Sequence, residues 1–183
     1  MAQSTGYLRK TGLIMGTILA LFLASCVETP KLGKDVSANV TPFAVSGSVK
    51  SRILVPARYL GTQEDRTQAV SVFAMNAMKK ELALSEMKIG NPAICTISGR
   101  VLRFDRRLKG NGRSDVTYRF MFTVKTRTVS RSITTGYTHH NAEKDRYDPE
   151  YAESLAEVIR QAVREQLLAG DTGSFIRNGC SDT

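Results

Sequence analysis

The fold is decided by the stretch VTYRFMFTV, residues 116–124, in which apolar and polar side chains alternate. A period of two places successive side chains on opposite faces of a β-strand. The tyrosine, the phenylalanines and the valines share one face, and Thr117, Arg119, Met121 and Thr123 share the other. The pattern therefore predicts a strand with one buried face and one solvated face.

The residues on either side of this stretch predict further strands. Residues 109–112 contain Asn-Gly, whose two residues tolerate the positive φ angles of a tight hairpin turn. Residues 95–101 alternate in the same way, and the pattern then shifts phase to Leu102 and Phe104, which predicts a bulge or the twisted end of a strand. A third strand is expected over residues 129–137. The centre of the chain is thus a three-stranded antiparallel unit.

Patterns outside this unit complete the expected order of elements. Residues 45–55 alternate and stop at Pro56, which predicts one more strand. Helices are expected over 62–82, which opens with a capping-box pair, and over 148–170, which opens with Asp-Pro and closes with glycine. The order βαβββα predicts an α+β two-layer sandwich, a mainly antiparallel sheet with two helices on one face.

The N-terminus has the pattern of a secretion leader. Arg9 and Lys10 precede a mostly apolar run over residues 11–23, which is shorter than the roughly 20 helical residues needed to cross a bilayer. The run ends in Leu23-Ala24-Ser25-Cys26, which resembles the lipobox of bacterial lipoproteins. An uncleaved anchor helix, or a chance cysteine behind an ordinary signal, are the alternatives. The expected division is a signal peptide over 1–25, a flexible tether over 26–43 and an α+β domain over 44–183.

The lipobox resemblance implies a modification and a location. In that family the cysteine thiol receives diacylglycerol, the chain is cut before it, and the new amino group is acylated, so Cys26 would carry the lipid. Several acyl chains on one residue give a stable anchor. An aspartate after the cysteine retains such proteins at the inner membrane of enteric bacteria. Val27 stands there instead, which favours the periplasmic side of the outer membrane over the inner membrane.

Charge and composition restrict the partners. The chain is 42% hydrophobic and 23% charged, which is ordinary for a globular domain. The formal charge is +9, and removing Arg9 and Lys10 with the leader leaves +7 (9 − 2). A basic surface favours anionic partners, which outside the cytoplasm are anionic lipid, lipopolysaccharide, glycan or acidic protein. Nucleic acid is not expected as a partner in that compartment.

The cysteines fit an oxidising compartment. With Cys26 used for lipid, Cys95 and Cys180 remain as an even pair, and a disulfide between them is expected. The alternative is one buried thiol and one exposed thiol in the C-terminal tail.

Motifs for catalysis or metal binding are weak. His139 and His140 are adjacent, so on a strand they point to opposite faces, and a solvated loop explains them better than a zinc site. The Gly110–Gly112 segment lies between strands and does not open a helix, which favours a hairpin turn over a phosphate loop. The acidic residues between 145 and 150 suit a helix N-terminus. The sequence therefore predicts a protein that is not an enzyme and has no cofactor or metal.

The strongest candidate for binding is a basic hairpin over residues 100–131. The apolar face of the strand is formed by even-numbered residues. Four cations of the hairpin are odd-numbered and are therefore expected on the opposite face: Arg119, Lys125, Arg127 and Arg131. Arginine suits phosphate and carboxylate oxygens because its planar guanidinium can donate two parallel hydrogen bonds. These four residues are therefore a predicted site for an anionic ligand. The alternative is a solvated basic face that keeps the domain soluble.

The order of elements and the strand Cys95–Val101 beside an arginine-rich hairpin are similar to two families of small envelope lipoproteins. One is the lipopolysaccharide-assembly lipoprotein, and the other comprises the auxiliary lipoproteins of ABC-type lipid transporters. The resemblance implies a non-catalytic accessory subunit of an envelope complex. The alternative function is a binding module for anionic lipid, lipopolysaccharide or glycan through the basic hairpin.

Overall fold

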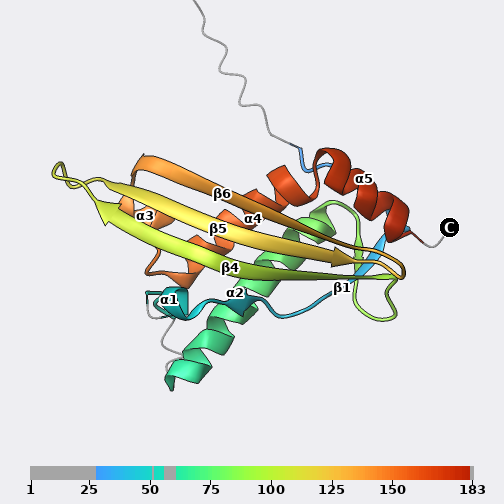
Figure 1. Ribbon diagram of the computed structural model, residues 1–183, viewed down its shortest axis with the longest axis horizontal. Helices are drawn as coiled ribbons and strands as arrows, with labels where there is room; N and C mark the ends of the chain where they lie inside the picture. Colours follow the sequence, from blue (N-terminus) through green and yellow to red (C-terminus); the bar gives the residue numbers. More distant parts are fainter. Residues whose placement is uncertain (1–27, 51, 56–60, 182–183) are drawn as a thin grey trace, which may run out of the picture.

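Three long antiparallel strands form most of the sheet (Figure 1). The structure, a computed structural model, describes residues 28–50, 52–55 and 61–181. The long strands are β4 (Cys95–Leu108), β5 (Ser114–Lys125) and β6 (Ser130–Ala142). Three short strands run parallel to their neighbours on the β4 side: β1 (Ser37–Val40), β2 (Ala44–Val45) and β3 (Lys88–Ile89). The strand order is β3-β1-β4-β5-β6, with β2 pairing further along β4, so the predicted mainly antiparallel α+β sheet is confirmed.

The helices lie behind this sheet in the view of Figure 1. The long helix α2 (Gln63–Leu84) and helix α4 (Ala152–Ala162) cover one face, and α4 continues into the π-turn η2 (Val163–Leu167). A further helix, α5 (Gly170–Gly179), lies near the end of the sheet where β1 is found. Two short helices are α1 (Gly47–Lys50) and α3 (Lys144–Tyr147). The predicted two helices on one face are confirmed, but the second begins at Ala152 and not at the predicted Asp148-Pro149 pair, and α5 was not predicted.

The start of α2 follows directly from its sequence. The Asp65 backbone N–H donates to Thr62 Oγ1 (3.2 Å), and the Thr62 backbone N–H donates to Asp65 Oδ2 (3.0 Å). These two bonds satisfy backbone donors that have no partner inside the helix. The Thr62 hydroxyl also donates to Asp65 Oδ2 (2.8 Å). This bond, together with the one from the Thr62 backbone N–H, holds the pKa of Asp65 below its usual value.

The core lies between the sheet and the helices. Tyr118, Phe120, Phe122 and Val124 of β5 are all fully buried, as the alternation predicts. Phe43 packs edge-on against Phe122, with ring centroids 6.2 Å apart. Aromatic pairs favour this arrangement because the positive ring edge meets the negative ring face.

The hairpin and the bulge are confirmed. The β4–β5 register shifts between Val101 and Arg103, at the predicted phase change. At the tip, the Lys109 N–H donates to the Arg113 carbonyl, and Gly112 has a φ of +77°. The third strand is also confirmed, although β6 begins at Ser130 and continues to Ala142. His139 and His140 therefore lie on a strand and not in a loop.

The strand predicted over 45–55 is wrong. β2 ends at Val45, and residues 47–50 form the short helix α1. The Val49 N–H donates to the Ser46 carbonyl, and the Arg52 N–H donates to the Val49 carbonyl, so local turn bonds replace a strand ladder. Val49, Ile53 and Val55 are buried, which explains why every second residue is apolar without a strand.

The flexible tether predicted over 26–43 does not hold for most of its length. It contains β1, and Leu32, Val36 and Phe43 within it are buried. The Leu32 N–H donates to the Ser85 carbonyl (2.8 Å), which fixes the segment to the end of α2. β1 has only four residues, too few for an alternation to stand out beside Gly33 and Pro42. The packed domain thus begins by residue 32 and not at 44.

The predicted leader over 1–25 and Cys26 lie outside the described residues. Among the residues that the structure does describe, no helix combines the length and the apolar character needed to cross a bilayer.

Candidate anion-binding surface

The outer face of the sheet, turned away from the helices, carries the polar side chains of β4, β5 and β6. Arg103 of β4 lies directly opposite Arg119 of β5, and Arg119 lies opposite Gly136 of β6. Both arginines are exposed. Like charges directly opposite each other on a sheet destabilise it. Asp105 already offsets part of this repulsion, because its Oδ2 lies 3.3 Å from Arg103 Nη2, and an anion beside Arg119 would offset the rest.

Arg103, Arg119 and Gly136 form a row across the three strands, and Gly136 leaves room beside Arg119. A Cβ at position 136 would lie 3.4 Å from Arg119 Cγ and 3.1 Å from the Tyr118 carbonyl oxygen. The Arg119 side chain therefore lies beside a strand position that has no side chain. A glycine inside a strand often marks a place where another group approaches closely. Sequence reasoning missed this residue, although a lone glycine in a predicted strand was the available signal.

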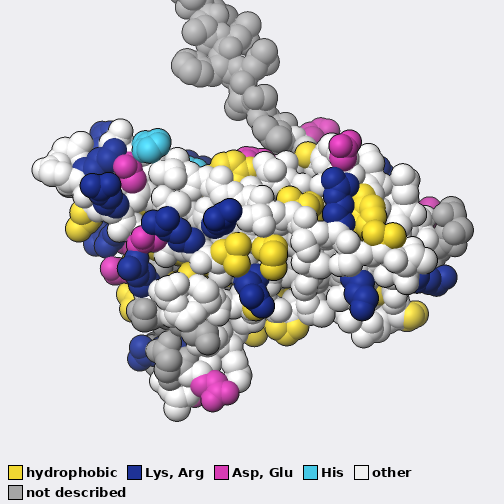
Figure 2. All heavy atoms as spheres, viewed as in Figure 1, with side chains coloured by type: hydrophobic (Ala, Val, Ile, Leu, Met, Phe, Trp, Pro, Cys, Tyr) yellow, Lys and Arg dark blue, Asp and Glu magenta, His cyan; other side chains and the backbone are white. Residues whose placement is uncertain are grey.

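Figure 2 shows this outer face, with basic side chains spread across the strands and few acidic ones among them. Lys125 lies on this face at the far end of β5, opposite Thr96 and Ser130, and it is exposed. Among the described residues, neither Arg119 nor Lys125 forms a salt bridge. Two of the four predicted ligand residues thus share one solvated surface.

Arg127 lies elsewhere. It belongs to the turn between β5 and β6, and it lines a hollow of about 460 Å³ together with Lys88 and residues 89–94. This hollow adjoins β1 and β3 and lies beyond the end of the outer face. Arg127 therefore does not join the Arg103–Arg119 pair.

Arg131 does not lie on the outer face, so its predicted position is wrong. It pairs with Val124, whose side chain is fully buried on the helix side. Its guanidinium lies 5.8 Å from the Phe175 ring centroid, and its Nη1 donates to the Asp171 carbonyl (3.4 Å). The prediction assumed that odd-numbered residues face outward in β6 as they do in β5. The turn has four residues and pairs Lys125 with Ser130, so even-numbered residues of β6 face outward.

A second group of cations lies at the last residues of β4, beyond the bulge. Arg52 and Arg103 both form ion pairs with Asp105. Arg106 points inward, where Nη1 donates to Asp148 Oδ2 (2.9 Å) and Nη2 donates to Glu150 Oε1 (3.2 Å). Asp148 is only 1% exposed, so this pair is nearly desolvated. Two of the acidic residues between 145 and 150 thus neutralise Arg106.

The hairpin tip is more balanced in charge. Lys109 Nζ lies 2.7 Å from Asp115 Oδ1, and His140 Nδ1 lies 3.2 Å from the same oxygen. The hydrogen bond from Lys109 lowers the pKa of Asp115 below its usual value. Asp115 thus offsets the charge of Lys109 at the tip.

The other face of the same strands holds a stacked aromatic cluster. The His139 ring stacks on Tyr147 of α3 at 4.0 Å, and Tyr118 stacks on His139 at 5.4 Å. The Tyr118 hydroxyl and His139 Nε2 are buried and lack a hydrogen-bond partner among the described residues. Burial raises the pKa of Tyr118. Burial, with a smaller effect from Arg146, lowers the pKa of His139. His139 thus serves the packing of α3 on the sheet as a neutral ring.

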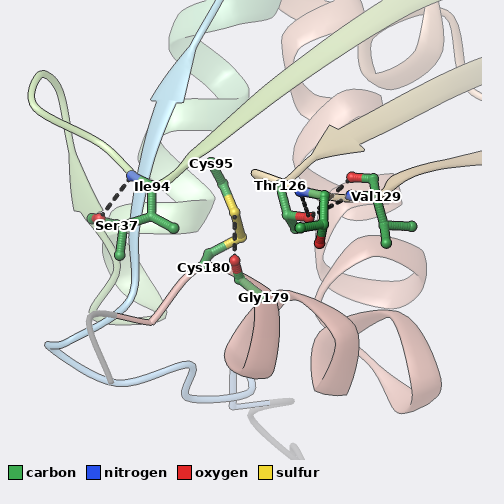
Figure 3. Close-up of a disulfide and its surroundings, with 8 residues drawn as sticks. Ser37, Ile94, Cys95, Thr126, Val129, Gly179 and Cys180 are labelled. Atoms are coloured by element: carbon green, nitrogen blue, oxygen red, sulfur yellow. Dashed lines mark hydrogen bonds between the residues drawn. A yellow bond between two sulfur atoms is a disulfide. The ribbon is translucent and has the colours of Figure 1, made fainter.

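The predicted disulfide is confirmed (Figure 3). It joins Cys95, at the start of β4, to Cys180, directly after α5, with their Cα atoms 5.2 Å apart. The Ser37 N–H donates to the Cys180 carbonyl (2.9 Å), so β1, β4 and α5 meet at this point. Within the part of the chain that the structure describes, no three His, Cys, Asp or Glu residues are grouped so that they could hold a metal ion.

Comparison with known proteins gives structural similarity only. No protein-family model matches the chain, and no curated protein matches it. One similar solved structure is the protein XCC0632 from Xanthomonas campestris, with 14% identity, a TM-score of 0.47, and 80% of this chain and 91% of that chain covered. Another is the PelC dodecamer from Paraburkholderia phytofirmans, with 13% identity, a TM-score of 0.42, and coverages of 74% and 92%. A third is the lipoprotein GNA1162 from Neisseria meningitidis, with 15% identity, a TM-score of 0.29, and coverages of 72% and 97%. These values are too low to transfer a function.

Proposed function

We propose that the protein is a lipid-anchored lipoprotein of the bacterial envelope and acts as a non-catalytic accessory subunit of an envelope complex. The observation that carries the proposal is the sequence Leu23-Ala24-Ser25-Cys26 directly after a short apolar run. Lipid on Cys26 holds the domain at the periplasmic side of the membrane. Val27 replaces the aspartate that would retain the protein at the inner membrane, so the outer membrane is favoured.

The disulfide supports this location. Disulfides persist in oxidising compartments and are rare in the cytosol. Cys95 and Cys180 are buried and bridged, so neither thiol is available as a nucleophile. The bridge therefore has a structural role, fixing α5 against β1 and β4, as expected of a domain that works outside the cytoplasm.

The proposal is tested by mass spectrometry of the protein from separated membrane fractions. We expect the mature chain to begin at Cys26, to carry acyl chains, and to be found in the outer-membrane fraction. A Cys26→Ser variant should remain uncleaved and unlipidated. A full-length native chain, or an unlipidated mature chain released from the membrane, would refute the anchor.

A second candidate function is binding of an anionic ligand by the outer face of the sheet. The Arg103–Arg119–Gly136 row favours it, because two exposed arginines are cross-strand partners and Arg119, which forms no salt bridge among the described residues, lies beside a position without a side chain. An anionic lipid, lipopolysaccharide or an acidic glycan carries phosphate or carboxylate groups that fit this pair.

Charge removal separates the two functions. The Arg119→Ser/Lys125→Ser variant should lose binding to vesicles of phosphatidylglycerol, and the native protein should lose that binding as salt is added. The matched variant Arg66→Ser/Lys80→Ser removes two exposed cations from α2 and should bind as the native protein does. If both variants bind equally, the outer face is not the anion site. An accessory subunit should still co-purify with its partner in either variant.

A further inference from the structure

A cleft of about 660 Å³ opens beside the last residues of β4, on the edge of the strand that does not face β5. Charged and apolar side chains both line it. It lies between β4 beyond the bulge, the segment around Leu54, and Pro149–Glu150. Other hollows lined by described residues have volumes of about 460, 370 and 300 Å³. Arginines and exposed leucines line the same space.

The cleft lies where β4 is no longer paired with a strand on the edge opposite β5. β2 pairs with β4 only at Arg100 and Val101, and β4 then continues to Leu108. Beyond the bulge, no strand in the described part of the chain pairs with this side of β4. An unpaired strand edge of this kind can accept an added strand.

This edge is nevertheless partly closed to a peptide. The Arg106 backbone N–H already donates to Asp105 Oδ1 (2.9 Å). The Asp105 carboxylate is in turn held by Arg52 and Arg103. An added strand would have to displace this carboxylate to form a continuous ladder. The cleft therefore suits an occupant that binds through side chains and needs no backbone ladder.

The charges in the cleft are not balanced. Arg52 and Arg103 share a single carboxylate, and Arg107 forms no salt bridge among the described residues. Each guanidinium carries five N–H donors, so Arg52 and Arg103 retain donors after binding Asp105. Arg106 is different, because Asp148 and Glu150 already neutralise it. Three arginines thus remain to bind an anionic group.

The apolar side chains in the cleft are unusually exposed. Leu108 is 69% exposed and Leu54 is 51% exposed. Both line the cleft beside the three arginines. Exposed apolar side chains are common singly, but a pair in a concave site rimmed by charge is typical of a ligand site.

We propose that this cleft binds one phospholipid with an acidic headgroup, whose phosphate contacts Arg52, Arg103 and Arg107 and whose acyl chains lie on Leu54 and Leu108. The proposal rests on the anion-binding function and deepens it, because it names the ligand class and places the site at the free side of β4. It needs no covalent step and no second ligand.

The test uses the mature lipoprotein in detergent micelles that contain phosphatidylglycerol with a photoactivatable acyl chain. The same chain on phosphatidylcholine is the comparison probe. Peptide mapping should place the phosphatidylglycerol adducts on the segments around Leu54 and Leu108, with far fewer adducts from phosphatidylcholine. The Arg103→Gln/Arg107→Gln and Leu54→Ser/Leu108→Ser variants should each reduce these adducts about tenfold, because each removes two contacts to the lipid.

Matched controls separate the site from general effects. Leu84→Ser/Val129→Ser removes two side chains that are 50% and 53% exposed and lie outside the cleft, and its adducts should match those of the native protein. All the replaced side chains are exposed, so every variant should retain the native thermal midpoint.

Several outcomes would overturn the proposal. Equal labelling by the two lipids, or adducts unaffected by the cleft variants, would exclude a headgroup-specific site there. If only Arg119→Ser/Lys125→Ser reduces labelling, the sheet face binds the anion and the cleft does not. If no variant changes labelling, both the cleft and the anion-binding function fail. If the cleft variants release a co-purifying protein without changing lipid labelling, the cleft is a protein contact.

Discussion

Removal of the Cys95–Cys180 disulfide should cost the domain much of its stability. The bridge closes a loop with a sequence separation of 85 residues. In the chain-entropy treatment, a loop of this length restricts the unfolded chain by about 4.5 kcal/mol at 25 °C. For a chain of this size, that loss lowers the thermal midpoint by roughly 10–18 °C. We therefore expect Cys95→Ala/Cys180→Ala to fold but to unfold at a much lower temperature.

The variant should still fold because other contacts hold α5. The Ser37 N–H donates to the Cys180 carbonyl, and Val36 forms an isolated bridge with Ser181. Ile176 of α5 is also fully buried. Alanine is the suitable replacement, because both cysteines are buried and a serine hydroxyl there would need a new hydrogen-bond partner.

Urea unfolding of the mature protein, followed by circular dichroism, measures the effect. The single variants Cys95→Ala and Cys180→Ala should each lose nearly as much stability as the double variant, because either one breaks the same crosslink. The urea m-value should rise, since the unfolded chain expands without the crosslink. A loss below about 1 kcal/mol, or single losses that add up to the double loss, would refute the loop-closure argument.

Three further predictions concern packing and charge in the same domain. Arg164→Ala should destabilise by about 2 kcal/mol in urea unfolding, because it removes a 2.9 Å ion pair from Glu81, which is 2% exposed, and leaves Arg160 Nε 3.9 Å from that carboxylate. Glu81→Gln should cost less, because the partly exposed Arg164 can be hydrated; equal losses would contradict this. Gly99→Ala should lower stability by about 3 kcal/mol, because its Cβ would overlap the Phe43 ring; an unchanged thermal midpoint would disprove the overlap. Because burial lowers the pKa of His139 from 6.5, its contribution to stability is complete above pH 6.5 and decreases as pH falls below it. The urea midpoint should therefore change less with acidification in His139→Gln than in the native protein, and parallel curves would exclude the effect.

The strands were predictable wherever an alternation ran long enough to bury a face. Residues 116–124 alternate over their whole length, and β5 contains them all and begins two residues earlier, at Ser114. The alternation over 45–55 misled, because buried side chains in short turns can also recur at every second residue. β1 could not be found in this way, since four residues between two parallel neighbours carry too little pattern. Long-range pairing with β4 decides its structure, and local sequence does not encode that pairing.

The candidate sites were less predictable than the strands, because they depend on register. The outward position of Arg119 followed from one strand alone. The inward position of Arg131 depended on the pairing of Lys125 with Ser130 across the turn. Ile133 and Tyr137 are odd-numbered, as Arg131 is, and are partly buried against the core. The apolar residues of that strand therefore indicated that Arg131 faces the helices. Arg52 was missed because its contact with Asp105 joins segments 53 residues apart.

The bulge at the centre of β4 links the fold to both proposed binding sites. Before it, Ile97 and Val101 point to the core at odd positions, and after it the buried residue is Phe104 at an even position. If the same sequence continued through Leu102 as a regular strand without the bulge, Arg103, Asp105 and Arg107 would turn toward the helices, and Phe104 would be exposed to solvent. A register slip of one residue moves every following side chain to the opposite face. The bulge therefore serves the core and the surface together: it buries the aromatic ring, and by the same shift it places Arg103 opposite Arg119 and Arg107 beside the cleft.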